Sequence, residues 1–331
     1  MCIRGDLEPG KENIRADSPT ASKESLKLAL TVAANETFKV KSADIKSAYL
    51  QGRKLERQIF VKPPPEAGVE GKLWLLLQGA YGIMDGGRLF YLQMTDTLEK
   101  LGCHRIHSDG AFFTFVKEGN LHCLIILNVD DLIIAGTELF EKEVLTKLQD
   151  VFRFSKVEEK SFTYCGCRVS MNDDGSIELH QNDYVDSLER IDAMEGDDNR
   201  ELLEHEKKKA RAKVGELLWL SLMTRPDLSY DINAISTEVS KATVKTAKEL
   251  NKIVARAKGD RNTIRFVKLG NLENLIINVY ADASFGNQNE GTRSTGGRVV
   301  LLENSTNGLV NIASWKTKKI TRVCRSVKGA N

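Results

Sequence analysis

Two adjacent acids, Asp130 and Asp131, interrupt an apolar run over residues 124–135. Burying ionised carboxylates is costly unless cations or hydrogen-bond donors compensate the charge. A bend between two strands would bury the flanks while both acids project into a cleft, where they could bind Mg²⁺, a cation that prefers carboxylate and phosphate oxygens. A tight turn that happens to use aspartates explains the local sequence equally well, so the pair alone does not decide between the two.

A third acid is needed if the pair serves nucleotidyl transfer. Two Mg²⁺ ions about 4 Å apart can activate an attacking hydroxyl and stabilise a leaving pyrophosphate. Asp44 directly follows a predicted strand at residues 38–43. It would join Asp130 and Asp131 if the two strands are neighbours in one sheet.

The elements around these acids predict an α+β fold, because period-two and helical hydrophobic patterns alternate along the chain. We expect helices that begin at residues 18–20, at residue 89 and after the N-cap Thr137, and strands at 38–43, 72–77, 111–117, 121–129, 132–135, 162–171 and 176–180. This order suits a mixed sheet with helices packed on one face. Residues 184–267 are predicted to be mostly helical, and strands return at 275–280 and 298–302. The long helices are expected at 201–223 and 236–258, and a domain boundary near 265–272.

The composition is that of an ordinary soluble globular protein, with 41% hydrophobic and 28% charged residues and a net charge of +2. No run approaches the roughly twenty apolar residues of a membrane span. The start of the chain lacks the hydrophobic core of a secretory signal. We therefore expect an intracellular protein without a membrane partner. The six scattered cysteines form no zinc pattern and are expected to be buried thiols.

The last part of the chain is basic, since residues 311–331 contain no acid. Lys316, Lys318 and Lys319 lie there and could bind a phosphate backbone by releasing its counterions. A solvated surface explains such a cluster as well.

Seven segments in order carry a stronger signal. In the first half they are Asp44 with Tyr49 and Leu50-Gln-Gly52, Leu77-Gln-Gly-Ala-Tyr81-Gly82 with Arg88, and Asn128-Val-Asp130-Asp131. Further on they are Phe162-Thr-Tyr-Cys-Gly166, Val214-Gly215, Thr224-Arg-Pro-Asp227, and Val279-Tyr-Ala-Asp282 with Ser314-Trp315. Together they resemble the copia-type retrotransposon Pol polyprotein, over its reverse transcriptase and the beginning of its RNase H domain. The resemblance extends from about residue 17 to residue 326.

The resemblance implies a right-hand polymerase fold. Residues 1–190 would form fingers and palm, residues 191–268 a helical thumb or connection, and residues 269–331 an incomplete RNase H-like domain. The implied function is RNA-directed DNA polymerisation, with an RNA or DNA template–primer and deoxynucleoside triphosphates as partners. Such a protein would work in a cytoplasmic particle or the nucleus.

The resemblance also implies roles for individual residues. Asp44, Asp130 and Asp131 would hold two Mg²⁺ ions, with Mn²⁺ as a substitute. Tyr49 would lie under the sugar of the incoming nucleotide and exclude a 2′-hydroxyl. Gln78 to Gly82 would border the nucleotide and template, and Arg88 would also belong to the nucleotide site. The residues expected to contact nucleic acid are Asn128, Gly166, Lys316, Lys318 and Lys319.

Some positions depart from the family's pattern. Asn128 replaces a tyrosine, which should weaken packing against primer or template. Asp85 stands in Asp85-Gly86-Gly87 where the family has Gln-Ala-Pro, which places a negative charge near the triphosphate. Arg4 matches the last arginine of a basic strand whose earlier lysine and arginine have no counterpart. Asp282 matches the first RNase H acid, but Asn331 stands at the next, so we expect no RNase H activity.

These departures leave two alternatives beside the polymerase. The first is a catalytically inactive relic that keeps the fold and at most binds nucleic acid. The second is an unrelated Mg²⁺-dependent phosphohydrolase, which would explain Asp130 and Asp131 but not Tyr49 or the segment ending at Asp227.

Overall fold

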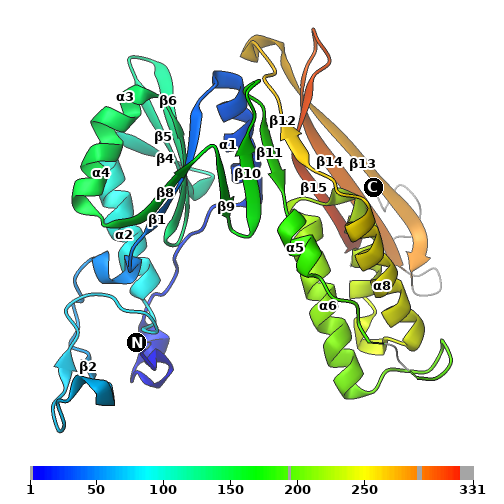
Figure 1. The fold of residues 1–331 in the computed structure, drawn as a ribbon, viewed down its shortest axis with the longest axis horizontal. Coiled ribbons are helices and arrows are strands. Elements are labelled where there is room, and N and C mark those ends of the chain that lie inside the picture. The colour runs from blue at the N-terminus through cyan, green and yellow to red at the C-terminus, as the bar shows by residue number, and fades with distance from the viewer. Residues whose placement is uncertain (1–2, 193–194, 289–292, 321–331) are drawn as a thin grey trace. The chain divides into compact units, whose positions relative to one another are not determined.

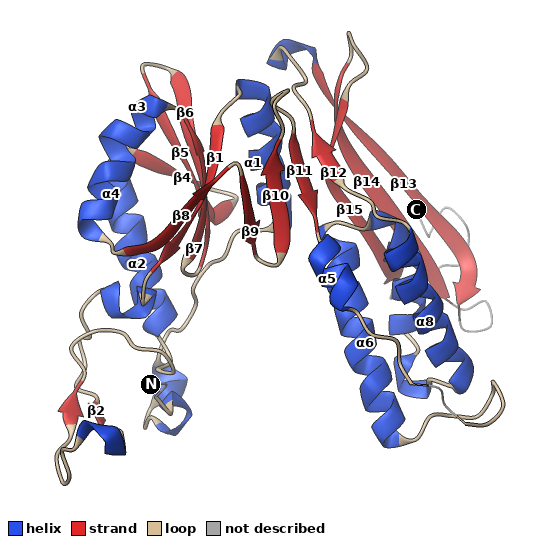
Figure 2. Ribbon diagram, viewed as in Figure 1, coloured by secondary structure: helices blue, strands red, loops and turns tan. Residues whose placement is uncertain are grey.

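The computed structural model describes residues 3–192, 195–288 and 293–320, without the side chains of residues 285–288 and 293. The chain divides into two compact units, Met1–Phe162 and Thr163–Asn331 (Figure 1). Helices and several sheets occur in the fold, as the sequence predicts (Figure 2). The finer division into residues 1–190, 191–268 and 269–331 stays a prediction. No helix in the described part of the chain is long and apolar enough to cross a membrane.

A six-stranded sheet with the order β4-β5-β6-β7-β1-β8 forms the centre of the first unit. Its strands are β1 (Lys39–Ile45), β4 (Cys103–Ile106), β5 (Asp109–Lys117), β6 (Asn120–Asn128), β7 (Asp131–Gly136) and β8 (Phe154–Glu159). All five neighbouring pairs are antiparallel. A mixed sheet would contain both parallel and antiparallel pairs. The prediction of a mixed sheet is therefore wrong, because every strand of this sheet runs antiparallel to its neighbours.

Helices cover both faces of this sheet, which corrects the prediction of helices on one face. Leu132 and Ile134 of β7 belong to a core shared with α2 (Gly86–Lys100) and α4 (Thr146–Val151). Ile133 is equally buried but must point to the other face, because side chains alternate along a strand. On that face α1 (Lys23–Glu36) contacts β6 and β7, and Figure 1 shows it across the sheet from α2 and α4.

The helix starts follow their capping residues. Ser22, whose Oγ accepts a bond from the Ser25 N–H at 3.0 Å, begins α1, so the expected start at residues 18–20 is wrong. Thr137 is confirmed as a cap, because it accepts from the Phe140 N–H ahead of the short α3 (Glu138–Phe140). A π-helical turn, Glu141–Leu145, joins α3 to α4. Helix α2 begins three residues before the predicted start, at Gly86, in a glycine pair that helical spacing does not indicate.

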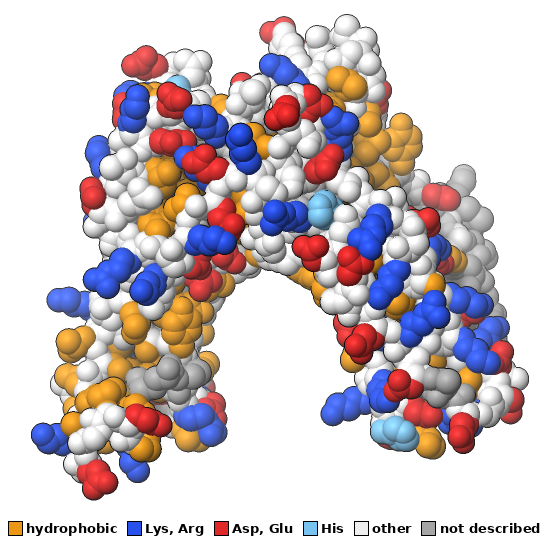
Figure 3. Space-filling view, in the orientation of Figure 1, with side chains coloured by type: hydrophobic (Ala, Val, Ile, Leu, Met, Phe, Trp, Pro, Cys, Tyr) orange, Lys and Arg blue, Asp and Glu red, His pale blue; other side chains and the backbone are white. Residues whose placement is uncertain are grey.

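A small two-stranded sheet lies apart from the large one within the first unit. It consists of β2 (Phe60–Val61) and β3 (Trp74–Leu75), so the strand expected at residues 72–77 is much shorter. The hydrophobic side chains of this sheet and its flanks are exposed: Phe60, Leu73, Trp74, Leu75 and Leu77. Figure 3 shows hydrophobic side chains on the surface of this unit.

The second unit begins within β9 and contains a four-stranded sheet of order β12-β11-β10-β9. Its strands are β9 (Ser161–Tyr164), β10 (Cys167–Met171), β11 (Ile177–His180) and β12 (Ile264–Phe266). The single strand predicted at residues 162–171 is split, because Cys165 and Gly166 take left-handed φ values of 47° and 71° and turn the chain. The predicted hairpin between β10 and β11 is confirmed.

Four helices share the hydrophobic core of the second unit: α5 (Asn182–Ser187), α6 (Glu204–Met223), α7 (Ser229–Ser236) and α8 (Val244–Gly259). The helix predicted at 236–258 is α8, which begins eight residues later than predicted, because Ser236 ends α7 and Thr243 is the N-cap of α8. The Thr243 N–H donates to Thr246 Oγ1 at 3.0 Å.

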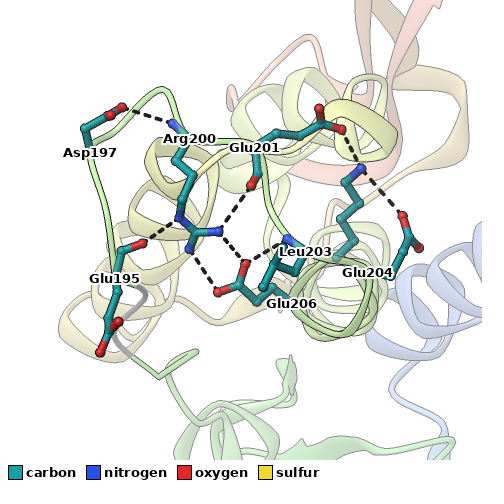
Figure 4. Close-up of polar contacts among 8 residues, drawn as sticks. Glu195, Asp197, Arg200, Glu201, Leu203, Glu204 and Glu206 are labelled. Atoms are coloured by element: carbon teal, nitrogen blue, oxygen red, sulfur yellow. Dashed lines mark hydrogen bonds and ion pairs between the residues drawn. The ribbon is translucent and has the colours of Figure 1, made fainter.

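The N-terminal end of α6 is held by a network of charged groups (Figure 4). Arg200 donates from both terminal nitrogens to Glu206, at 2.9 and 3.0 Å. Glu206 also accepts a bond of 2.8 Å from the Leu203 N–H. Lys207 pairs with Glu201 at 2.5 Å. These bonds keep residues 201–203 outside the helix, which begins three residues later than predicted.

A three-stranded antiparallel sheet completes the second unit. Its strands are β13 (Leu275–Gln288), β14 (Arg293–Asn304) and β15 (Val310–Ile320), in that order. The strands predicted at 275–280 and 298–302 are present but longer.

Candidate active site

The three predicted acids come together where two strands and a turn meet. Asp44 and Asp131 are direct partners across the antiparallel pair of β1 and β7. Val129 and Asp130 form the turn from β6 to β7, and Val129 takes a left-handed φ of 56°. The Ile45 N–H donates to the Asp130 carbonyl at 3.0 Å. The structure thus holds Asp44 beside two acids that lie 86 and 87 positions further along the chain.

The acids repel one another. Asp44, Asp130 and Asp131 are each half-buried. Burial raises the pKa of Asp131, and the negative charges of Asp130 and Asp44 raise it further. A cation near these groups would relieve both effects, since it favours the ionised form.

The three acids supply oxygen ligands suited to a metal ion, but they are not arranged as a ready metal site. In the chain as described, no three His, Cys, Asp or Glu side chains form a ready set of metal ligands. The Asp44 carboxylate accepts a hydrogen bond from the Ser155 hydroxyl of β8, and Ser155 Oγ also lies 3.4 Å from the Asp44 carbonyl. The chemistry of the three carboxylates nonetheless fits a hard divalent cation, which prefers oxygen ligands.

Tyr49 lies next to the acids. It belongs to a 3-10 turn, Ala48–Gln51, and its ring stacks on that of Tyr81 with centroids 4.5 Å apart and planes at 22°. Burial and the charge of Asp130 raise the pKa of both phenols. The sequence predicts a specific role for Tyr49, whereas Tyr81 is only one of the residues Gln78 to Gly82 expected to border the nucleotide, and its stacking on Tyr49 is not predicted.

Two glycines make room for the Tyr49 ring. A Cβ at Gly86 would lie 3.2 Å from Tyr49 Cδ2 and 2.7 Å from the Ala80 carbonyl oxygen. A Cβ at Gly87 would lie 3.3 Å from Tyr49 Oη. The two glycines, where Ala-Pro was expected, therefore let the Tyr49 ring pack directly against this backbone.

The predicted nucleotide-binding residues have protein partners. Gln78 Nε2 donates to the Gly52 carbonyl at 3.3 Å. Gly82 has a φ of 100°, and a Cβ there would lie 1.9 Å from the Ile3 carbonyl oxygen, so only glycine fits. Arg88 Nη1 donates to Asp17 at 2.7 Å. Their expected role in nucleotide binding stays a prediction.

Asp85 forms an ion pair with Arg57, a residue to which the sequence assigned no role. Two Arg57 nitrogens donate to the two carboxylate oxygens of Asp85 at 2.6 and 2.8 Å, and Arg57 Nε donates to Glu8 at 2.7 Å. These two acids raise the pKa of Arg57 above its ordinary value. The negative charge expected at Asp85 is thus offset in part by Arg57, which also pairs with Glu8. Nothing in the local sequence around Arg57 indicates this pairing across 28 residues.

The remaining predicted residues are spread over both units. Asn128 ends β6, opposite Asp131. Gly166 forms the turn between β9 and β10. Asp282 lies on β13, and Lys316, Lys318 and Lys319 lie on β15. The contacts expected of these residues with nucleic acid stay predictions.

Comparison with known proteins decides the family. Residues 7–199, more than half of the chain, match the family described as reverse transcriptase (RNA-dependent DNA polymerase). The chain belongs to the reverse transcriptase family. Its three candidate acids, Tyr49 and Tyr81 all lie within the matched residues.

Curated relatives of this reverse transcriptase chain are Pol polyproteins and a related transposon protein. The Retrovirus-related Pol polyproteins from transposons RE1 and RE2 of Arabidopsis thaliana are 25% and 26% identical to it, over 96% of the chain. The chain spans 22% of the length of each. The Putative transposon Ty5-1 protein YCL074W of Saccharomyces cerevisiae is 25% identical, with 85% of the chain and 93% of that protein aligned. The resemblance to copia-type Pol polyproteins is confirmed.

Proposed function

We propose that this chain catalyses RNA-directed DNA synthesis at Asp44, Asp130 and Asp131. The observation that carries the proposal is the β1–β7 register, which pairs Asp44 with Asp131 beside the turn that presents Asp130. Membership of the reverse transcriptase family supports a nucleic-acid template and deoxynucleotide substrates.

In the proposed reaction the primer 3′-oxygen forms a bond to the α-phosphorus of the nucleotide. The bond from that phosphorus to the bridging oxygen breaks, pyrophosphate leaves, and the hydroxyl proton passes to solvent. Asp44, Asp130 and Asp131 would hold two Mg²⁺ ions, which lower the pKa of the hydroxyl and stabilise charge on the leaving group. Ser155 holds the Asp44 carboxylate by a hydrogen bond. The Tyr49 ring, stacked on Tyr81, would fill the space that a 2′-hydroxyl needs.

The proposal extends to the architecture. The six-stranded sheet would be the palm, and the small sheet of β2 and β3 would belong to the fingers. Helices α6 to α8 would form a thumb or connection, and β13 to β15 the beginning of an RNase H-like domain around Asp282. We propose that this last part is without nuclease activity, because Asn331 stands at the position of the family's second acid.

Primer extension on an RNA template tests the proposal. The full chain should add deoxynucleotides in the presence of Mg²⁺, and Asp130→Asn should reduce the rate at least about 100-fold, since it removes one of the groups that offset transition-state charge. Asp150→Asn, at an exposed position on α4, is the control and should leave the rate unchanged. Equal rates for the chain and for Asp130→Asn would refute the proposal.

An inactive relic that binds nucleic acid is the second candidate. The absence of a ready metal cage in the described residues and the pairing of Arg88 with Asp17 favour it. In that case a primer–template hybrid should bind in a salt-dependent way, equally to the chain and to Asp130→Asn, without extension.

A further inference from the structure

Three basic side chains share one face of the three-stranded sheet. Arg298 of β14 and Lys316 of β15 are direct partners in the register, and Lys318 is the partner of Gly296 two residues further along. Direct partners and residues two positions apart point to the same side of a sheet. Arg298, Lys316 and Lys318 are all exposed, and we refer to them together as the basic face.

Lys319 points to the opposite side. That side is marked by Trp315, which is buried and donates from Nε1 to the Ser221 carbonyl of α6 at 2.8 Å. Lys319 is four residues from Trp315 on the same strand and therefore shares its side. It lines a hollow with Lys241, which follows α7, and Glu249 of α8. In the sequence, Lys316, Lys318 and Lys319 form one group because all three are basic. The structure places Lys319 on the opposite side of the sheet from the other two.

The surface between the three basic side chains is shallow and lined by small residues. Arg298, Lys316 and Lys318 line a hollow of about 410 Å³ together with Ala281, Asp282, Ala283, Gly296 and Gly297. Asp282 is the one acid among these lining residues. In the register it is the partner of Gly297, which places its side chain on the side opposite the basic face. Small side chains let a polymer backbone approach the strands closely.

The charge of the basic face is not balanced by ion pairs. Over residues 3–192, 195–288 and 293–320, none of the three cations forms a salt bridge, whereas Lys207, Lys213 and Arg265 of the same unit all do. Lys316 and Lys318 are about 7 Å apart along the strand, at about 3.4 Å a residue. Three cations this close match the dense negative charge of a nucleic-acid backbone, with one phosphate every 3.4 Å or so along each strand.

We propose that the basic face binds the sugar–phosphate backbone of the template–primer duplex. The basic face indicates a polyanion as its ligand, and only the choice of nucleic acid as that polyanion rests on the proposed function. It adds Arg298 as a contact and excludes Lys319. Because the groups are cations on a flat surface, they bind phosphates without reading the bases.

Salt-dependent binding of a labelled RNA–DNA hybrid tests the proposal. Fluorescence anisotropy is measured with the full chain carrying Asp130→Asn, without nucleotides or Mg²⁺, between about 50 and 200 mM salt. Lys318→Gln and Arg298→Gln should each lower the slope of log affinity against log salt by about 0.9, because each removes one phosphate contact. Lys318→Arg should keep the slope. Lys319→Gln, a neighbouring change of the same charge, is the matched control and should also keep it.

Two results would overturn the inference. One is an unchanged slope in the variant that carries Arg298→Gln, Lys316→Gln and Lys318→Gln together, with its circular dichroism spectrum intact. The other is an equal fall in slope for Lys318→Gln and Lys319→Gln. Neither result depends on catalysis. A chain that fails to extend primers can still bind the duplex through the basic face, and an active chain can still fail to do so.

Discussion

The rings of Tyr49 and Tyr81 stack with centroids 4.5 Å apart, and the charge of Asp130 raises the pKa of both phenols. The stacking restricts the Tyr49 ring to one position beside the acids. In the proposed reaction this position decides whether a 2′-hydroxyl is accepted. Tyr81 is then a positioning residue that acts through Tyr49.

Tyr81→Ala should loosen the selection of deoxynucleotides. A stacked aromatic pair contributes about 0.5–1.5 kcal/mol, so the ratio of kcat/KM for deoxynucleotides over ribonucleotides should fall about 2- to 12-fold. Tyr81→Phe keeps the ring and should keep the ratio. Single-nucleotide extension with both nucleotide types measures it. An equal loss of kcat/KM for both types in Tyr81→Ala would mean that Tyr81 has only a general structural role.

Asp131→Asn should stabilise the fold at neutral pH. Burial and two neighbouring acids raise the pKa of Asp131 in the folded chain. Protonated Asp131 is favoured in the folded chain, so it stabilises the fold fully at pH values below the pKa of Asp131 in the unfolded chain, near 3.9. This stabilisation is lost as the pH rises through the raised pKa of Asp131 in the folded chain. The variant should melt at a higher temperature than the parent at pH about 7, and no higher at pH about 3. Calorimetry at the two pH values checks this.

Mg²⁺ provides a second measurement on the same variant. A cation that binds only the folded state raises the melting temperature. Mg²⁺ should therefore raise that of the parent chain more than that of Asp131→Asn. Equal shifts in both would argue against binding at these acids, whatever the catalytic activity.

Asp85→Ala should destabilise the first unit. It removes two of the hydrogen bonds of Arg57 and leaves Glu8 as its partner, which should lower the free energy of unfolding by about 1–3 kcal/mol. Urea titration measures the change. Asp6→Ala breaks the exposed pair with Arg4, where solvent screens the charges, and should have no measurable effect. If Asp85 only repelled the triphosphate, Asp85→Ala would leave stability intact and tighten nucleotide binding.

Glu206→Gln should weaken the start of α6 in a pH-dependent way. Arg200 and the Leu203 N–H lower the pKa of Glu206 from 4.5 to about 2. A lowered pKa contributes stability that is present above the unfolded value and lost as the pH falls toward about 2. Parent and variant should thus differ in thermal stability at neutral pH and converge below pH 4.5. A difference that stays constant across this window would exclude the ion pair as the cause.

Much of the local structure was predictable from the sequence. The Thr137 cap, the β10–β11 hairpin and the strands that flank the Asp pair were all predicted. Each depends on contacts within a few residues, so spacing and residue type carry enough information. Helix starts were harder, because Ser22 competes with other plausible caps nearby and α2 begins after Asp85, whose side chain makes no cap bond.

The sequence by itself determined the family, since seven collinear segments agree with one pattern and Asp44, Asp130 and Asp131 hold their places in it. Only the tertiary structure decided how distant side chains pair. It paired Tyr81 with Tyr49 and Arg57 with Asp85, and it placed Arg298 with Lys316 and Lys318 while turning Lys319 to the other side. The physical reason is that register and packing, which bring these groups together, depend on the whole sheet and its helices rather than on neighbouring residues.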